Sequence, residues 1–261
     1  MNIRKPLVSI ITPSFNQCQF IEDTILSVIN QTYSNIQYIL VDGGSTDDTM
    51  KIVEKYRDKI DIIFHEKDKG QSDAINKGFR VAKGELVGWI NSDDILNPEC
   101  VERIVGLYLA YPNGSIYYGA KLNFIKENND FIRMISLIVP NKKILLSHNY
   151  DIIQPGSFYK NEMIKKLNYL NEELHFSMDL DLWLRLLDMG PIYYDNTLPL
   201  ANFRFWEDSK TCSCQKVFFR EIRQTLRRHG AHRFDKTIMR LNYYLFKELI
   251  KQALNIRNKR H

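Results

Sequence analysis

Two adjacent carboxylates, Asp93 and Asp94, are the residues whose types and spacing point most directly to chemistry. They follow an apolar run at residues 85–90, and Asn91 stands two positions before Asp93. Neighbouring carboxylates at a strand end can hold a hard cation such as Mg²⁺ or Mn²⁺, which keeps water ligands and binds diphosphate oxygens. Taken alone, the pair is better explained as a turn that caps a helix near Pro98.

Three other stretches carry carboxylates where a ligand could bind. In residues 42–47 (DGGSTD) the glycines allow close backbone approach, and Asp42 can accept a hydrogen bond from a base or ribose. In residues 68–74 (DKGQSDA) a charged turn precedes a helix start, which favours phosphate. In residues 178–183 (MDLDLW) Asp179 can remove a proton from an acceptor hydroxyl. Each alone also suits a turn, a solvated loop or a helix cap, and no G-x-G-x-x-G fingerprint occurs.

Alternating strand and helix patterns in the first hundred residues position these clusters. Short β-branched runs predict strands at 7–12, 36–42, 61–65 and 85–91, and helical periodicity predicts helices at 20–29, 72–81 and 101–109. A further helix is expected after a cap at Ser45 or Thr46.

Strands and helices that alternate in this way imply a mostly parallel sheet flanked by helices, an α/β fold. Ligands bind beyond the carboxyl ends of such strands. Four polar groups lie at those ends: Thr12, Asp42, residues 65–68 and residues 91–94. Their convergence on one sheet edge is the main reason to expect an active site there.

The second half of the chain is less regular. Residues 117–150 are weakly patterned, with short β-like runs, and residues 172–189 are mostly helical. Two basic helices are expected after Lys216. The apolar stripes expected on these helices are Leu180, Trp183, Leu184 and Leu187, and then Ile238, Leu241, Leu245 and Leu249.

Charge is unevenly placed along the chain, whose formal net charge is +5. From Lys216 onward there are 13 Lys or Arg against 3 Asp or Glu, a local excess of +10 that leaves −5 for the rest. This basic extension is either an ordinary solvated surface or a peripheral contact with the inner face of a membrane. Nucleic-acid binding is not expected, because no recognised module is present.

The remaining composition indicates a folded protein in a reducing compartment. Hydrophobic residues make up 44%, and no apolar run approaches the roughly 20 residues of a spanning helix. The start of the chain has no signal-peptide core, so a cytoplasmic location is expected. The four cysteines include no Cys-x-x-Cys pair, which predicts free thiols and no structural zinc site.

In their order and spacing, these clusters closely resemble glycosyltransferase family 2, over roughly residues 6–211. The matching stretches are VSIITPSFN (8–16), SVINQT (27–32), VDGGSTDDT (41–49), DKGQSDA (68–74), INSDD (90–94), QPGSF (154–158), MDLDLWLR (178–185), FR (203–204) and SKT (209–211). The resemblance implies a GT-A type, Rossmann-like catalytic domain at 1–211. Its nucleotide-sugar half is about 1–110 and its acceptor-side half is 111–211. A basic helical extension follows at 212–261.

The resemblance also implies a role for individual residues. Thr12, Pro13 and Asp42 would line the nucleotide-base pocket, with Asp42 on uracil. Asp73 would lie near the ribose and diphosphate, Asp93 would reach the ribose or sugar, and Asp94 would be the main metal ligand. Asp179 takes the place of the catalytic base. The residues expected on the acceptor or diphosphate side are Gln154, Asp181, Trp183, Arg204 and Lys210.

The sequence departs from the family pattern at three places. Asn91 replaces the usual first carboxylate, which leaves metal binding more dependent on Asp94. Met178 replaces the carboxylate that often precedes the base. Residues 205–208 (FWED) stand where many relatives have a His.

The predicted function is inverting transfer of a sugar from a nucleotide-sugar, a UDP-sugar, to an acceptor hydroxyl with Mn²⁺ or Mg²⁺. By resemblance the setting is bacterial surface polysaccharide synthesis, with a glycan or lipid-linked sugar as acceptor. Two alternatives remain: a catalytically silent nucleotide-sugar-binding protein and a nucleotidyltransferase. The second would show a Gly-rich, Lys- or Arg-bearing loop after the first strand, where this chain has TPSFN (12–16).

Overall fold

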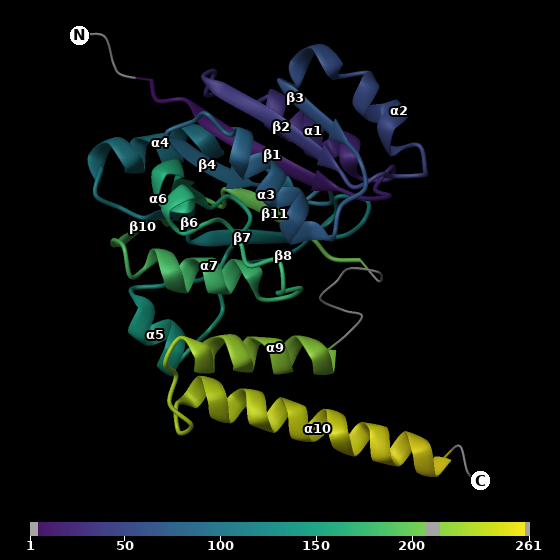
Figure 1. Ribbon diagram of the computed structural model, residues 1–261, viewed down its shortest axis with the longest axis vertical. Coiled ribbons are helices and arrows are strands. Elements are labelled where there is room, and N and C mark those ends of the chain that lie inside the picture. The colour runs from purple at the N-terminus through teal and green to yellow at the C-terminus, as the bar shows by residue number, and fades with distance from the viewer. Residues whose placement is uncertain (1–4, 207–214, 259–261) are drawn as a thin grey trace.

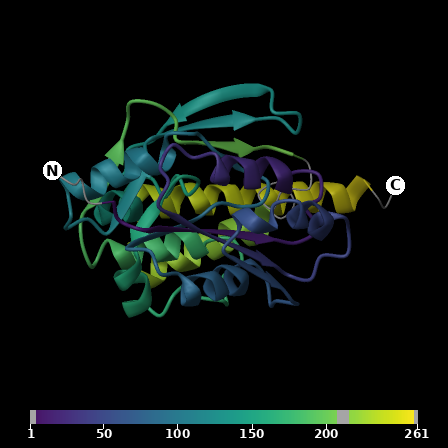
Figure 2. The same cartoon turned by 90° about the horizontal axis from the view of Figure 1, so that it is seen from above.

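The strand β1 (Val8–Ser14) is buried along its whole length, because it lies between two neighbours in a sheet that is covered on both faces. The structure is a computed structural model, and it describes residues 5–206 and 215–258. The sheet has seven strands in the order β10-β6-β9-β4-β1-β2-β3. Figures 1 and 2 show α1 and α3 on opposite faces of this sheet.

The first half of the chain confirms the predicted parallel α/β arrangement. Its parallel strands are β1, β2 (Ile36–Asp42), β3 (Ile62–His65) and β4 (Leu86–Trp89). The helices are α1 (Ile21–Ile29), α2 (Thr49–Glu54), α3 (Gln71–Val81) and α4 (Cys100–Ala110), with the short 3-10 turn η1 (Arg57–Lys59). The register aligns Ser14 with Asp42 and Asp42 with His65, so the predicted polar ends meet at one edge.

The predicted cap of the second helix is wrong. Asp48, and not Ser45 or Thr46, occupies the position before α2. Ser45 is engaged elsewhere, because its hydroxyl donates to Asp42 Oδ1 at 2.5 Å.

The second half adds one strand of opposite direction and a second sheet. In the large sheet, β9 (Phe158–Lys160) lies antiparallel between β4 and β6 (Ile116–Gly119), and β10 (Ile192–Asp195) pairs parallel with β6. The small sheet contains β5 (Ile95–Leu96), β11 (Ala201–Arg204), β7 (Lys121–Ile125) and β8 (Phe131–Ser136). The helices of this region are α5 (Lys142–Ser147), α6 (Asn161–Lys166) and α7 (Met178–Leu186).

The helix α7 is shorter than the predicted 172–189. Residues 175–177 donate their backbone N–H groups to the Glu221 side chain and do not join the helix. The expected apolar face is otherwise confirmed, since Leu180, Trp183 and Leu184 are buried.

The two predicted basic helices are present as α9 (Gln215–Arg228) and α10 (Lys236–Asn258), and they stack below α7 in Figure 1. The predicted domain boundary at 211 lies outside the described residues. The predicted stripe on α10 is only partly right, because Ile238 and Leu241 are buried but Leu249 is 53% exposed. Within the described part of the chain, no helix is long and apolar enough to cross a membrane.

Candidate active site

The loop that follows β4 carries the adjacent carboxylates. Asp94 is 1% exposed: its Oδ1 accepts from the backbone N–H of Arg204 at 3.0 Å, and its Oδ2 accepts from the Asn91 amide at 3.3 Å. Asp93 is less buried, and its Oδ2 accepts from Trp206 Nε1 at 3.0 Å. The two carboxylates are therefore held in different ways, and Asp93 is the more accessible of the two.

Both carboxylates are held in surroundings that oppose their negative charge. Burial, and after it the charge of Asp93, raises the pKa of Asp94 well above its ordinary value. Burial also raises the pKa of Asp93, against the opposing hydrogen bond from Trp206. A divalent cation beside the pair would favour the ionised forms of both groups.

The donor set fits a cation that completes its shell with substrate oxygens. The described residues contain no group of three or more His, Cys, Asp or Glu side chains that could hold a metal. Mg²⁺ in particular is often held by one or two carboxylates together with waters and substrate phosphates. The Asn91 amide is 3.3 Å from Asp94 Oδ2, a longer contact than the 3.0 Å bond from Arg204 N–H, so it is the contact that a cation would more easily displace.

The guanidinium of Arg204, predicted on the acceptor or diphosphate side, is fully buried. It donates to the carbonyl oxygens of Asp93 at 2.8 Å and Glu127 at 2.6 Å and to Asp23 Oδ2 at 2.9 Å. Its carbon also lies 4.5 Å from the centroid of the Phe20 ring. The structure thus assigns Arg204 to holding the carboxylate loop in place, a role that its sequence neighbours do not indicate.

The residues predicted around the nucleotide base lie deeper than expected. The Asp42 carboxylate is fully buried and accepts from Gly44 N–H, Ser45 N–H and hydroxyl, and the Nδ1 side of His65 at 2.7 Å. Thr12 Oγ1 is 3.1 Å from the Tyr38 hydroxyl. Asp42 therefore shapes the 43–45 turn, and a base contact from it would have to reach a fully buried carboxylate that already has these four bonds.

Thr12 and Pro13 lie within the buried strand β1. Asp68 has no individually predicted role, although its carboxylate lies against Gly43. A Cβ on Gly43 would fall 2.4 Å from Asp68 Oδ2, so only glycine leaves room for this approach. Asp68 is only partly buried, and it adds a carboxylate to the edge where the base was expected.

The start of α3 joins the donor side to the loop before α7. Gln71 donates to Asn91 Oδ1 at 2.8 Å, and the Ser72 hydroxyl donates to the carbonyl of Leu174 at 3.1 Å. Asp73 accepts from the backbone N–H of Lys69 at 3.0 Å, so its carboxylate orders the preceding turn. The predicted donor and acceptor halves are therefore connected through one helix terminus.

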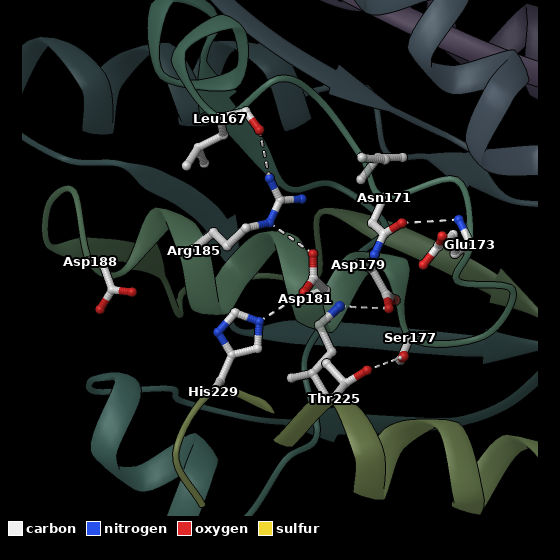
Figure 3. A network of polar contacts seen from close by, with 12 residues as sticks. Leu167, Asn171, Glu173, Ser177, Asp179, Asp181, Arg185, Asp188, Thr225 and His229 are labelled. Carbon is white, nitrogen blue, oxygen red and sulfur yellow. Dashed lines mark hydrogen bonds and ion pairs between the residues drawn. The ribbon is translucent and has the colours of Figure 1, made fainter. Parts of the chain in front are cut away.

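The two acidic residues of α7 have different surroundings (Figure 3). Asp179 is partly exposed, and its Oδ1 accepts from Leu180 N–H at 2.7 Å. Asp181 is buried between Arg185 Nε and His229 Nε2, each at 2.8 Å. Burial opposes ionisation of Asp181, but the bonds from His229 and Arg185 outweigh it and lower its pKa. Asp179 is thus the carboxylate of α7 that an acceptor hydroxyl can approach.

The other predicted acceptor-side residues are not gathered at the surface. Trp183 is fully buried and donates from Nε1 to the Tyr159 hydroxyl at 3.0 Å, which places it in the core. Gln154 is buried and donates to the carbonyl of Trp89 at 2.9 Å, just before the carboxylate loop. Lys210 lies outside the described residues.

Comparison with known proteins identifies a family for the chain. The profile of the family described as Glycosyl transferase family 2 matches residues 9–168. An uncharacterized glycosyltransferase of Rickettsia felis is 31% identical over 228 residues, which cover 82% of this chain and 37% of that protein. Chondroitin synthase of Escherichia coli is 27% identical over 240 residues, covering 88% of this chain and 34% of that protein. In these two pairs the chain spans little more than a third of its relative.

A solved structure shares the fold at low sequence identity. The crystal structure of S. aureus TarS residues 1–349, in complex with UDP-GlcNAc, has a TM-score of 0.69 and 19% identity. The match covers 93% of this chain and 71% of that chain. The likeness therefore shows a common GT-A type fold.

Proposed function

The chain belongs to glycosyltransferase family 2, and from that premise we propose that it moves a sugar from a nucleotide-sugar donor to an acceptor hydroxyl with inversion. The observation that carries the proposal is the adjacent pair beyond the end of β4, buried Asp94 and half-buried Asp93, where a bound cation would offset the negative charges that burial disfavours. UDP is the nucleotide we favour, because a similar fold binds UDP-GlcNAc.

The proposed chemistry is a single displacement. Asp179 accepts the proton of the acceptor hydroxyl as the oxygen attacks the anomeric carbon, so the bond to the nucleoside diphosphate breaks as the new one forms. Asp94 would hold Mn²⁺ or Mg²⁺ with the diphosphate, Asp93 would reach the ribose or the sugar, and the cation would stabilise the negative charge of the leaving group. Asn91 and Arg204 hold the Asp94 carboxylate in place.

The direct test is UDP release from a panel of UDP-sugars in the presence of Mn²⁺, with GDP- and dTDP-sugars as comparison. Metal-dependent UDP release supports the transferase, because a transferase without its acceptor slowly transfers the sugar to water and releases UDP. Tight UDP-sugar binding without release would favour the silent binding protein, in which Trp206 keeps one oxygen of Asp93 occupied.

We further propose that the setting is bacterial surface polysaccharide synthesis, with a glycan or lipid-linked sugar as acceptor. The support is the relation to chondroitin synthase, whose name describes polysaccharide assembly. A lipid-linked acceptor would be presented at a membrane surface, so a peripheral contact with the inner face is part of this proposal.

The outward face of α10 suits such a contact. Met239, Tyr243, Phe246 and Ile250 recur at helical spacing and are 58%, 53%, 60% and 43% exposed. They lie on the side opposite the buried Ile238 and Leu241, so α10 has two apolar faces and only one packs against the protein.

Cations gather in a hollow that also contains Ile238 and Asn242 of α10. Arg223, Arg227, Arg228 and Arg233 line a hollow of about 670 Å³ between α9 and α10, and none of them forms an ion pair with a described residue. Arginines without an ion pair to a described residue, on the same pair of helices as an exposed apolar stripe, fit an anionic bilayer surface.

Co-sedimentation with phosphatidylglycerol vesicles tests the membrane contact. Phe246→Ser should reduce binding, whereas Phe131→Ser should not, because that equally exposed side chain lies on β8. A chain that does not sediment with anionic vesicles would show α10 to be an ordinary solvated surface.

A further inference from the structure

One carboxylate of the C-terminal helices lies at the start of the helix that carries Asp179. Glu221, on α9, accepts from the backbone N–H groups of His175 at 3.1 Å, Phe176 at 2.7 Å and Ser177 at 2.8 Å. It also accepts from the Ser177 hydroxyl at 3.0 Å. Ser177 is the residue that precedes α7, and its own side chain does not cap the helix. A side chain from a helix far away in the sequence therefore holds the residues that lead into α7.

The charge of Glu221 is suited to this role. Its burial opposes ionisation, but the N–H groups of Phe176, Ser177 and His175 outweigh this effect and lower the pKa of Glu221. The positive end of a helix also favours a negative charge at this place. Glu221 is therefore an anion bound by the chain segment that leads into α7.

Two further contacts join the region of α7 to the C-terminal part of the chain, one to α9 itself and one to His229, the residue after α9. The Ser177 hydroxyl is 2.9 Å from the Thr225 hydroxyl, one turn along α9 from Glu221. His229 Nε2, just beyond α9, is 2.8 Å from Asp181 Oδ1 (Figure 3). Asp179 thus stands between two attachment points, Ser177 on one side and Asp181 on the other. A shift of α9 would displace both.

We propose that Glu221 is a positioning residue for catalysis: it holds the start of α7 so that Asp179 meets the acceptor hydroxyl. This inference rests on the proposed function, in which Asp179 is the base. On this proposal α9 contributes to the geometry of the acceptor site, in addition to packing against α10. A misplacement of about 1 Å in a reacting group can cost about 10²-fold in rate. The three N–H bonds to Glu221 should therefore affect the turnover rate more than the stability of the fold.

The test compares Glu221→Gln with Gln224→Ala, an exposed position on the same helix. All of these donors reach Glu221 Oε1, and only the His175 N–H also reaches Oε2, so the Gln carbonyl can replace Oε1 while the substitution removes the negative charge and turns an NH₂ group toward His175. We expect kcat of Glu221→Gln to fall by about 10²-fold, with the donor KM and the calorimetric Kd for UDP unchanged. Gln224→Ala should match the natural protein in all of these.

The pH profile separates positioning from stability. A displaced base changes its surroundings, so the acidic limb of the kcat profile should move in Glu221→Gln. If kcat fell only in proportion to the folded fraction, with the limb unmoved, Glu221 would stabilise the fold and do no more. An unchanged kcat would also overturn the inference.

The two proposals fail in distinguishable ways. Asp179→Asn with full activity would remove the premise that Asp179 is the base. Asp179→Asn without activity, combined with a fully active Glu221→Gln, would leave the proposed function standing and reject the positioning role.

Discussion

The two acidic residues of α7 offer a matched pair of substitutions, Asp179→Asn and Asp181→Asn, for which we expect opposite outcomes. Both replace a carboxylate with an amide of the same shape on the same helix. Asp179 is partly exposed, with a hydrogen bond to the adjacent backbone N–H, whereas Asp181 is buried between Arg185 and His229 at 2.8 Å each. The first substitution should therefore affect turnover and the second stability.

The magnitudes follow from these contacts. Removing a general base costs about 10²–10⁴-fold in kcat, so Asp179→Asn should lose this much with its free energy of unfolding within about 0.5 kcal/mol. Hydrogen bonds to charged groups contribute about 1.5–3 kcal/mol, so Asp181→Asn should lose roughly that amount. For a chain of this size each kcal/mol lowers Tm by about 2–4 °C.

The effect of Asp181 on stability should depend on pH. Its folded-state pKa is lowered, so its contribution is fully present above the unfolded value of about 3.9 and is lost as the pH falls through the folded value. The gap in Tm between the natural protein and Asp181→Asn should therefore be widest near neutral pH and should narrow below about pH 4.

UDP-release kinetics and thermal melts at several pH values measure both quantities. The reasoning is refuted if Asp181→Asn loses turnover at full stability, or if Asp179→Asn remains active. The first result would make Asp181 the base in spite of its two partners.

Two further predictions concern the donor side and the core. Asp94→Asn should abolish the gain in UDP affinity that Mn²⁺ provides, measured by calorimetry with and without the cation; an unchanged gain would assign the cation to Asp93 alone. Gly78→Ala should cost about 1–3 kcal/mol, because the new Cβ would lie 2.6 Å from Ile11 Cγ2 in a fully buried site, and thermal melts measure this loss. Gly106→Ala is its control in α4: with nothing within 4 Å of the added Cβ, it should stabilise the protein by about 1 kcal/mol, and equal effects of the two would contradict the steric argument.

The sequence predicts well those elements whose hydrophobic pattern lies within the element itself. Residues 36–42 form β2 as predicted, because a β-branched run between turn residues carries its own signal. The parallel order of the first strands follows from their alternation with helices. The short strand β9 has only three residues, and its place between β4 and β6 depends on partners far away in the chain, so no local pattern indicates it.

The site shows the same division between local and distant information. The sequence places carboxylates at strand ends correctly, since the register brings Asp42 beside Ser14 and His65. The sequence does not show that the Ser45 N–H and hydroxyl already donate to the Asp42 carboxylate. An Asp followed by Gly and Ser could have suggested this, because Asp side chains in turns often accept from the backbone a few residues on. Glu221 reads as an ordinary polar residue of a basic helix, because its partners are more than 40 positions earlier.

The antiparallel strand β9 has a consequence for how the chain is made. β6 reaches the rest of the large sheet only through β9, and β9 is synthesised almost 40 residues after β6 ends. Until Phe158–Lys160 has left the ribosome, β4 presents an unpaired edge, which is a template for pairing with other chains. We therefore expect the nascent chain to be most prone to aggregation after β4 has been synthesised and before β9 has. Fragments that end before β9 should need a chaperone to stay in solution.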